Sequence, residues 1–192
     1  LKQILMPTHK LWEPSDSFIE NSHLQDYKKW LKQNLNLEFK SYQDLWQWSI
    51  TNVEDFWESI WTYFKVISHS PYKNVLSSYN MPNCKWFEGA KLNYAEHLFR
   101  KAKNNETAII FGNESEHIEK ISWLQLKTKV TSLATYLKSI GVTKGDRVVA
   151  FIPNVPEATI AFLAVNSIGA IWSSTSPDFG AESVVDRFAQ IK

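Results

Sequence analysis

The architecture follows from one run of residues, Arg147-Val-Val-Ala-Phe-Ile-Pro-Asn-Val-Pro-Glu-Ala-Thr-Ile-Ala-Phe-Leu-Ala-Val-Asn-Ser-Ile-Gly-Ala-Ile-Trp-Ser-Ser174. Its beginning, residues 147–152, has the continuous apolar character of a strand buried on both faces, and Pro153 ends that strand. Residues 157–168 have the composition of a helix that Gly169 closes, and residues 170–174 form a second apolar run. A strand, a helix and a strand of these lengths predict a βαβ unit with parallel strands.

The flanking segments extend this pattern in both directions. Residues 177–180 have turn composition, and residues 181–191 predict one more helix. On the other side, Ser122 and Gln125 have capping-box spacing before a helix whose apolar positions recur every three or four residues up to Gly141. Residues 107–111 and 117–121, with the turn-forming sequence 112–115 between them, predict a β-hairpin.

The amino-terminal half has a different character, with helical patterns and most of the nine Trp residues. Residues 1–21 predict an extended arm. Three amphipathic helices are predicted behind three capping candidates, Ser22, Ser41 and Asn52. The third helix carries an apolar stripe that could stack on a planar ligand, although packing within the protein is the simpler interpretation: Phe56, Ile60, Trp61 and Phe64. Residues 71–89 are loop-like and separate the two patterns.

These elements together predict an α/β fold, a layered and mainly parallel sheet with an amino-terminal helical lobe and a β-hairpin. We place one domain, an arm with a helical Trp-rich lobe, at residues 1–98, and the start of a second at residues 99–192. Two or three parallel strands make a narrow sheet, and the last helix runs to Lys192 with no strand after it. We therefore expect the chain to be the amino-terminal part of a longer protein. An exposed sheet edge in it could self-associate.

Composition excludes several classes of partner and site. The chain has 192 residues, 21 basic and 20 acidic side chains and a net charge of +1, so it lacks the positive field that nucleic-acid binding needs. Its most apolar stretch, residues 158–172, is polar in places and shorter than the ~20 residues of a membrane-spanning helix. Cys84 is the only cysteine, which excludes an intrachain disulfide and favours a reducing, cytoplasmic location.

Motif searches find none of the common catalytic signatures. The six glycines never take G-x-G-x-x-G spacing, and neither a P-loop nor a G-x-S-x-G elbow occurs. The five histidines lack the spacing of a metal site, so no metal ligand is expected. Asp146 and Arg147 open a buried strand, where turn chemistry and a surface ion pair explain them better than catalysis. The residues alone therefore indicate an α/β domain but no particular reaction.

A resemblance takes the interpretation further. The chain resembles the acetoacetate–CoA ligase family, within the adenylate-forming acyl-CoA synthetase superfamily, over nearly its whole length and in the same order. The stretches that carry the resemblance are Leu11-Trp-Glu-Pro-Ser15, Trp86-Phe-Glu-Gly-Ala-Lys-Leu-Asn-Tyr-Ala-Glu96, Gly145-Asp-Arg-Val-Val-Ala-Phe-Ile-Pro-Asn-Val-Pro-Glu-Ala158, Gly169-Ala-Ile-Trp-Ser-Ser-Thr-Ser-Pro-Asp-Phe-Gly180 and Asp186-Arg-Phe-Ala-Gln-Ile-Lys192. Glu88 and Thr175 depart from the family pattern, at positions where no chemistry is expected.

The resemblance implies an acid–thiol ligase of lipid and ketone-body metabolism. Such an enzyme uses ATP to convert acetoacetate to an acyl-adenylate and pyrophosphate, and CoA then displaces AMP to give acetoacetyl-CoA. It also implies that residues 1–98 form the family's amino-terminal lobe and that residues 99–192 begin its AMP-binding domain. ATP, CoA and Mg²⁺ belong to the full-length protein, because the family's phosphate loop and catalytic lysine have no counterpart in residues 1–192. We therefore expect no catalytic residue and no bound cofactor in this chain.

One local site is implied as well. In acetate ligases the loop that corresponds to Ser176, Pro177, Asp178, Phe179 and Gly180 lines the route of the CoA pantetheine arm, and here it would follow a strand's carboxyl end. The competing interpretation is a simple turn in which Asp178 favours the start of the next helix.

Two further functions stay open. The chain could belong to a ligase for another short acid, acetate or propionate, or to a non-catalytic interaction domain built on the same fold. The natural sequence beyond Lys192 distinguishes the enzyme from the interaction domain, because a phosphate loop and a later catalytic lysine would be present only in the enzyme.

Overall fold

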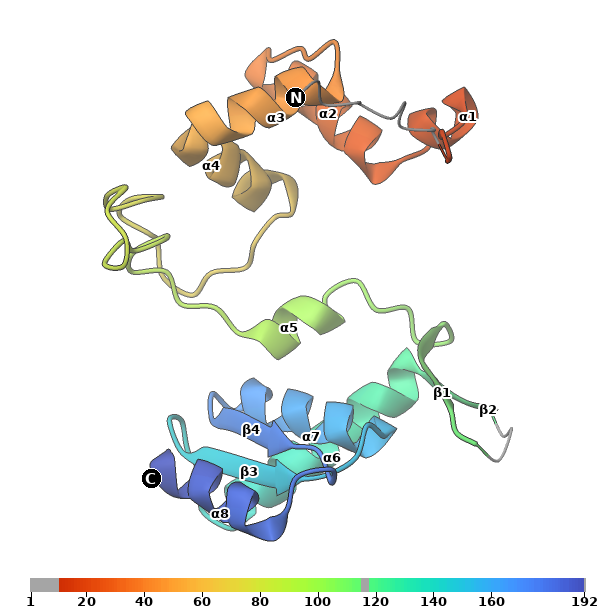
Figure 1. Cartoon of the computed structure of the whole chain (residues 1–192), viewed down its shortest axis with the longest axis vertical. Helices are drawn as coiled ribbons and strands as arrows, with labels where there is room; N and C mark the ends of the chain where they lie inside the picture. Colours follow the sequence, from red (N-terminus) through yellow and green to blue (C-terminus); the bar gives the residue numbers. More distant parts are fainter. Residues whose placement is uncertain (1–10, 115–117, 192) are drawn as a thin grey trace, which may run out of the picture. The chain divides into compact units, whose positions relative to one another are not determined.

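The computed structural model describes residues 11–114 and 118–191, which fall into two compact units (Figure 1). The first, called the helical unit here, contains the described residues up to Val66 together with Tyr72–Glu88. The second, called the α/β unit, contains Ile67–Pro71 and the residues from Gly89 onward. Each unit has its own cluster of buried apolar side chains, so each is described by itself.

The helical unit is built from short helices with sequence-encoded starts. Their bounds are α1 Asp16–Glu20, α2 His23–Leu35, α3 Tyr42–Thr51 and α4 Val53–Tyr63. The predicted caps are confirmed at Ser22, which accepts from the backbone N–H of Gln25, and at Ser41, which forms a full capping box with Asp44. The helices enclose a small core whose buried members are Tyr27, Leu31 and Leu45.

Two predictions for this unit are wrong. The predicted extended arm contains α1, because the Ser15 side chain accepts from the Phe18 N–H and starts a helix there; residues 1–10 of the arm lie outside the described residues. Asn52 stands at the N-cap of α4 but makes no side-chain capping bond. It is also the C-cap of α3, and its φ and ψ of −116° and 58° lie outside the extended conformation of the N-caps at Ser22 and Ser41.

The aromatic stripe of α4 packs within the helical unit. Trp61 stacks on Phe87 at 4.5 Å between ring centroids and meets the edge of Tyr72. Beside the stripe, the Ser59 hydroxyl donates to the Phe56 carbonyl at 2.6 Å, so its oxygen is left to accept from the Tyr27 hydroxyl at 2.5 Å. Burial raises the pKa of Tyr27, which keeps that donor protonated.

The α/β unit begins with a helix and a hairpin and ends with the predicted βαβ pattern. Its elements are α5 Tyr94–Phe99, β1 Thr107–Gly112, β2 Ile118–Ser122, α6 Trp123–Ser139, β3 Arg147–Phe151, α7 Pro156–Ser167, β4 Ile171–Thr175 and α8 Ala181–Gln190. β1 and β2 pair antiparallel, and β3 pairs with β4 in parallel, from Arg147 opposite Ile171 to Phe151 opposite Thr175. The α/β class with a hairpin and parallel strands is confirmed. The parallel sheet has two strands among the described residues.

Both ends of α6 follow from its sequence. Ser122 and Gln125 form a capping box at its start. At its end the Gly141 N–H donates to the Lys138 carbonyl and the Val142 N–H to the Leu137 carbonyl, each at 3.0 Å, which is the Schellman arrangement. That arrangement requires a positive φ, and Gly141 supplies it at 95° without a steric cost.

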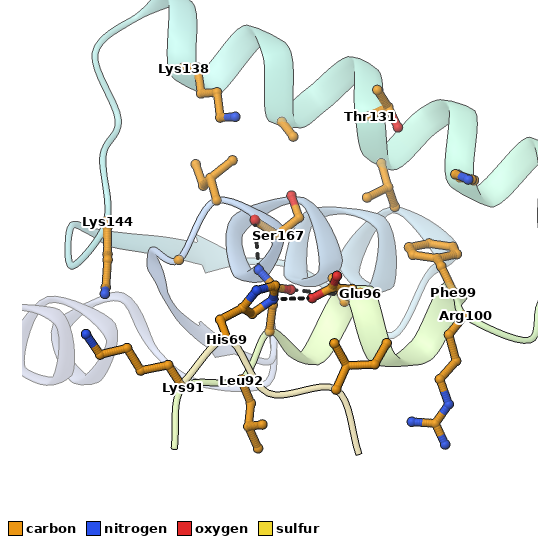
Figure 2. A pocket seen from close by; sticks show the side chains of 18 of the residues that line it. His69, Lys91, Leu92, Glu96, Phe99, Arg100, Thr131, Lys138, Lys144 and Ser167 are labelled. Atoms are coloured by element: carbon orange, nitrogen blue, oxygen red, sulfur yellow. Dashed lines mark hydrogen bonds and ion pairs between the residues drawn. The ribbon is translucent and has the colours of Figure 1, made fainter. Parts of the chain in front are cut away.

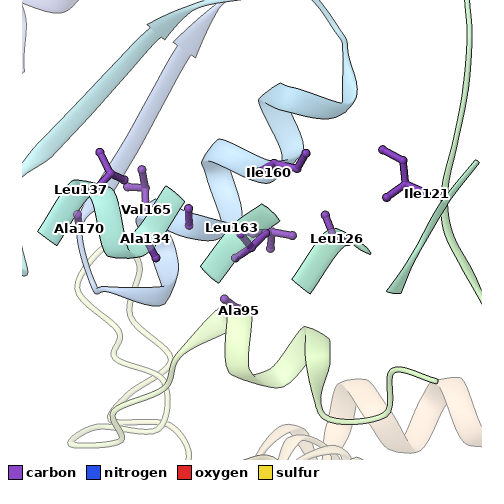
Figure 3. Close-up of a cluster of buried hydrophobic side chains, with 11 residues drawn as sticks. Ala95, Ile121, Leu126, Ala134, Leu137, Ile160, Leu163, Val165 and Ala170 are labelled. Atoms are coloured by element: carbon purple, nitrogen blue, oxygen red, sulfur yellow. The ribbon is translucent and has the colours of Figure 1, made fainter. Parts of the chain in front are cut away.

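The core of the α/β unit lies where α6 and α7 meet each other and the strands (Figure 3). The largest fully buried side chains of this unit are Leu126, Leu163 and Val165. On the strands, Val148 and Trp172 pack against this core, whereas Val149 and Ile171 are 43% and 53% exposed. The prediction that residues 147–152 are buried on both faces is therefore wrong for this chain, because the described residues cover mainly one face.

Asn93 joins two helix ends inside the α/β unit. Its side-chain oxygen accepts from the Glu96 N–H at 3.2 Å and caps α5, while its amide donates to the carbonyl of Ser167 at 3.0 Å at the end of α7. One side chain therefore satisfies backbone groups that both helices leave unpaired. Tyr94, the next residue, places its ring 5.6 Å from that of Phe162 on α7.

We expect Asn93→Ala to lower the free energy of unfolding by about 1–2 kcal/mol, because it removes an N-cap and a donor to α7 together. Urea unfolding monitored by circular dichroism measures the change, with Asn80→Ala as the control, since Asn80 is exposed in a loop of the helical unit. Equal stabilities of the two variants would contradict this role of Asn93.

Candidate functional site

The candidate site is the loop between β4 and α8, residues Ser176–Gly180. β3 and β4 are parallel, so their carboxyl ends share one edge, where the Ile152 N–H donates to the Thr175 carbonyl at 3.1 Å. The loop starts at this edge directly after Thr175, and Gly180 is the N-cap of α8. Ligands of open α/β sheets bind beyond the carboxyl ends of the strands, and the loop has that position.

Hydrogen bonds within the loop fix its first half as a turn. The Ser176 hydroxyl donates to the Asp178 carboxylate at 2.6 Å, and the Phe179 N–H donates to the Ser176 carbonyl at 3.2 Å. The Asp178 carboxylate is therefore used locally in this structure. The turn that was the alternative interpretation is present, and it holds Phe179 at the start of α8.

Phe179 is the apolar group that the loop presents to its surroundings. Its side chain is 39% exposed, and the Arg187 guanidinium lies 4.3 Å from the centre of its ring. A cation over an aromatic face is attracted to the ring's negative face, so this contact orients the ring. Phe179 lies two residues before α8 begins at Ala181, and Arg187 lies six residues after Ala181. That spacing of eight residues, about two helical turns, is the signal in the sequence that could have suggested the contact.

Thr175 is the polar group at this edge that sequence reasoning missed. It is 9% exposed, and its hydroxyl has no hydrogen-bond partner among the described residues. A buried hydroxyl without a partner costs about 1–3 kcal/mol, and most buried polar side-chain atoms in native proteins bond to protein or water. The departure from the family pattern at Thr175 therefore coincides with a buried hydroxyl that has no partner among the described residues.

Asp146 and Arg147 lie at the opposite end of β3 from this loop. The Asp146 carboxylate accepts from the backbone N–H of Thr143 at 2.7 Å and from its hydroxyl at 2.9 Å. These bonds, the backbone one first, lower the pKa of Asp146. The Arg147 guanidinium donates to the Gly145 carbonyl at 3.3 Å. Both side chains thus serve the turn before the strand.

The described part of the chain contains no group of three or more His, Cys, Asp or Glu side chains placed to share a metal ion. Within the same part, none of the helices has the length and apolar character needed to cross a bilayer.

Comparisons with known proteins agree along the whole chain. Residues 96–192 match the family described as AMP-binding enzyme, and residues 42–98 match the one described as acetyl-coenzyme A synthetase N-terminus. The chain is 38% identical over 193 residues to acetoacetyl-CoA synthetase of Gallus gallus, which covers 98% of this chain and 28% of that protein. It is 37% identical over 181 residues to acetoacetyl-coenzyme A synthetase of Rhizobium meliloti (strain 1021), covering 94% of this chain and 28% of that protein.

A solved structure shows the same likeness in three dimensions. Acetoacetyl-CoA synthetase from Streptomyces lividans superimposes with a TM-score of 0.88 at 37% identity, over 94% of this chain and 28% of that one. The chain thus spans about 28% of the length of the relatives that it matches. Their sequence and structural similarity extends through both compact units.

Proposed function

This chain belongs to the family of AMP-binding enzymes, and from that premise we propose that it is the amino-terminal part of an acetoacetate–CoA ligase. The whole protein then converts acetoacetate, ATP and CoA to acetoacetyl-CoA, AMP and pyrophosphate. The supporting observation is the match of nearly the entire chain to acetoacetyl-CoA synthetases, in sequence and in backbone structure. A cytoplasmic location and a place in ketone-body and lipid metabolism are part of the same proposal.

The reaction has two displacements. A carboxylate oxygen of acetoacetate attacks the α-phosphorus of ATP and pyrophosphate leaves; the CoA sulfur then attacks the acyl carbon, loses its proton, and AMP leaves. Mg²⁺ would supply charge neutralisation at the phosphates. In this proposal residues 1–98 form the amino-terminal lobe and residues 99–192 begin the adenylation domain, with the groups that act on the phosphates elsewhere in the whole protein.

The role we propose for this chain is to shape the path of CoA. The loop Ser176–Gly180 stands at the carboxyl end of β4, and the pantetheine arm of CoA has both amides and methylene groups. Phe179 offers a partly exposed ring against which the methylene groups can pack. This ring supports a CoA channel along this edge of the sheet.

The proposal is tested with the full-length protein and with the 192-residue chain side by side. With ATP and Mg²⁺, we expect the full-length protein to release pyrophosphate with acetoacetate at least tenfold faster than with acetate or propionate, and to form thioester when CoA is added. The 192-residue chain alone should release none above background. Pyrophosphate is measured by a coupled assay and thioester by its ultraviolet absorbance.

The other outcomes separate the alternatives. A preference for acetate or propionate would contradict acetoacetate as the substrate and favour a ligase for another short acid. No reaction with any acid would favour a non-catalytic domain. Pyrophosphate release by the 192-residue chain would contradict our placement of the catalytic groups.

A further inference from the structure

A cavity lies in the α/β unit, at the edge of the sheet opposite the candidate site. Its volume is about 1050 Å³, and it is lined by residues of α5 and α6, by Lys144 before β3, by Gly169 before β4, and by Ile67 and His69 (Figure 2). Lys144 and Gly169 precede their strands, whereas the loop Ser176–Gly180 follows β4. The strands separate the two sites by about 16 Å, the length of five extended residues. The cavity is therefore independent of the proposed CoA channel.

Positive charge is concentrated on this cavity. Five of its lining residues are cationic and Glu96 is its one acidic lining residue, so with His69 neutral the lining carries 5 − 1 = +4. The whole chain carries +1, which leaves 1 − 4 = −3 for everything else. The cationic residues are Lys91, Arg100, Lys127, Lys138 and Lys144.

The four lysines of this cavity have no carboxylate beside them. Lys32, Lys85 and Lys103 each pair with a glutamate at 2.6–2.9 Å, whereas exposed lysines such as Lys129 form no such pair among the described residues. Among the described residues, no ion pair joins any of the four lysines of the cavity to a carboxylate. The Glu96 carboxylate is already engaged, because it lies 2.6 Å from His69 Nε2 (Figure 2). Among the described residues, no carboxylate therefore neutralises these ammonium groups.

The two lysines that α6 contributes to the cavity are well separated along one face of the helix. Lys127, Thr131 and Lys138 recur at intervals of four and seven, which places them on one helical face, and small side chains such as Ala134 lie between them. Lys127 and Lys138 are eleven residues apart, or about 16 Å along the helix. In Figure 2 Lys91 and Lys144 extend toward one end of the cavity and Arg100 toward the other.

We propose that this cavity binds a small molecule that carries a polyphosphate group, with the phosphates held among Lys91, Lys138 and Lys144. Linked phosphates bring several negative charges into a small volume, which suits a cavity lined by several cationic side chains and by no free carboxylate. The apolar floor, which includes Val130 and Ile168, can cover the remainder of such a molecule. A single carboxylate would neutralise only one of the three ammonium groups.

Inorganic tripolyphosphate is the probe, titrated into the 192-residue chain by isothermal calorimetry at 0.15 M ionic strength, a generic physiological value. The test variant is Lys91→Gln with Lys144→Gln. The control is Lys120→Gln with Lys129→Gln, which removes the same charge from exposed positions outside the cavity, one of them on α6. We expect the test pair to weaken binding at least tenfold and the control pair less than twofold.

Equal weakening by both pairs, or no binding to the unchanged chain, would overturn the proposal, because a diffuse field or no site would then explain the charges. Circular dichroism checks that each variant is folded; should the test pair unfold, the single variant Lys138→Gln replaces it and is held to the same criterion against Lys129→Gln. A parallel titration with ATP shows whether a nucleoside adds affinity to the phosphates. Because catalysis is not measured, failure here leaves the proposed ligase activity untouched, and failure of that activity leaves this site untouched.

Discussion

Replacing Leu163 by alanine should lower the free energy of unfolding of the α/β unit by about 3–5 kcal/mol, the range for large-to-small changes in a close-packed core. Leu163 is 1% exposed, on the face of α7 that packs against α6 (Figure 3). The alanine loses the burial of the removed methyl groups and leaves a cavity that the two helices cannot fully close. Since small domains are stable by about 5–15 kcal/mol, a substantial share of the unit's stability would be lost.

Urea unfolding measures this change, and Leu124→Ala is its control. Leu124 is on α6 but 49% exposed, so its removal creates no internal cavity and should change the stability by less than about 1 kcal/mol. Trp123 and Trp172 pack on the core of the α/β unit, so their fluorescence contributes a signal from this unit. Similar losses in both variants would show that α6 and α7 do not form the core described above.

Local signals in the sequence predicted the elements of the chain well. The capping boxes at Ser41 and Ser122 and the positive-φ glycine after α6 each depend on a few neighbouring residues, and those neighbours are visible in the sequence. Asn52 shows where such reasoning fails. Its spacing is correct, yet the same residue also ends α3, and the backbone conformation of a residue shared by two helices does not follow from that spacing.

Burial was predictable only where the partner segment lies within the described chain. The run 147–152 has the composition of a strand covered on both sides, but Val149 and Phe151 are 43% and 51% exposed. Composition indicates whether a side chain is suited to burial, whereas its actual exposure depends on which elements pack against it in the tertiary structure. The same reasoning accounts for Thr175, whose orphaned hydroxyl is a property of its burial and not of its residue type.

The candidate site was predictable in position but not in detail. The turn at Ser176–Asp178 follows from local chemistry, because short polar side chains bond to neighbouring groups in the chain. Predicting the contact between Phe179 and Arg187 requires the exact start of α8, at Ala181, because the start determines which helix residues face the loop. Boundaries of elements are the least predictable feature of a sequence, so contacts that depend on them are found only in the structure.

Phe179→Ala in the full-length protein should raise the KM for CoA at least tenfold while the KM for ATP changes less than twofold. The ring is 39% exposed beyond the carboxyl end of β4, and burying an aromatic face against the methylene groups of pantetheine contributes about 1–2 kcal/mol. Asp178→Ala should act in the same direction but less strongly, because its carboxylate holds the turn through Ser176 and thereby positions Phe179. Initial rates of thioester formation, with each substrate varied in turn, give both constants.

Two matched variants decide whether the effect arises from contact with CoA. Tyr136→Ala is the control for general destabilisation, because it removes an aromatic ring that is 59% exposed on α6. If Phe179→Ala acted only through a general loss of stability, the two variants would change the KM values alike. Arg187→Ala leaves the Phe179 ring in place and removes the cation 4.3 Å from its centre, so a smaller rise in the KM for CoA is expected from a ring that is less well oriented. If the KM values for CoA and ATP rose together in Phe179→Ala, the loop would be a structural turn. A selective rise for CoA would place the loop on the path of CoA, because a general loss of stability would affect both substrates.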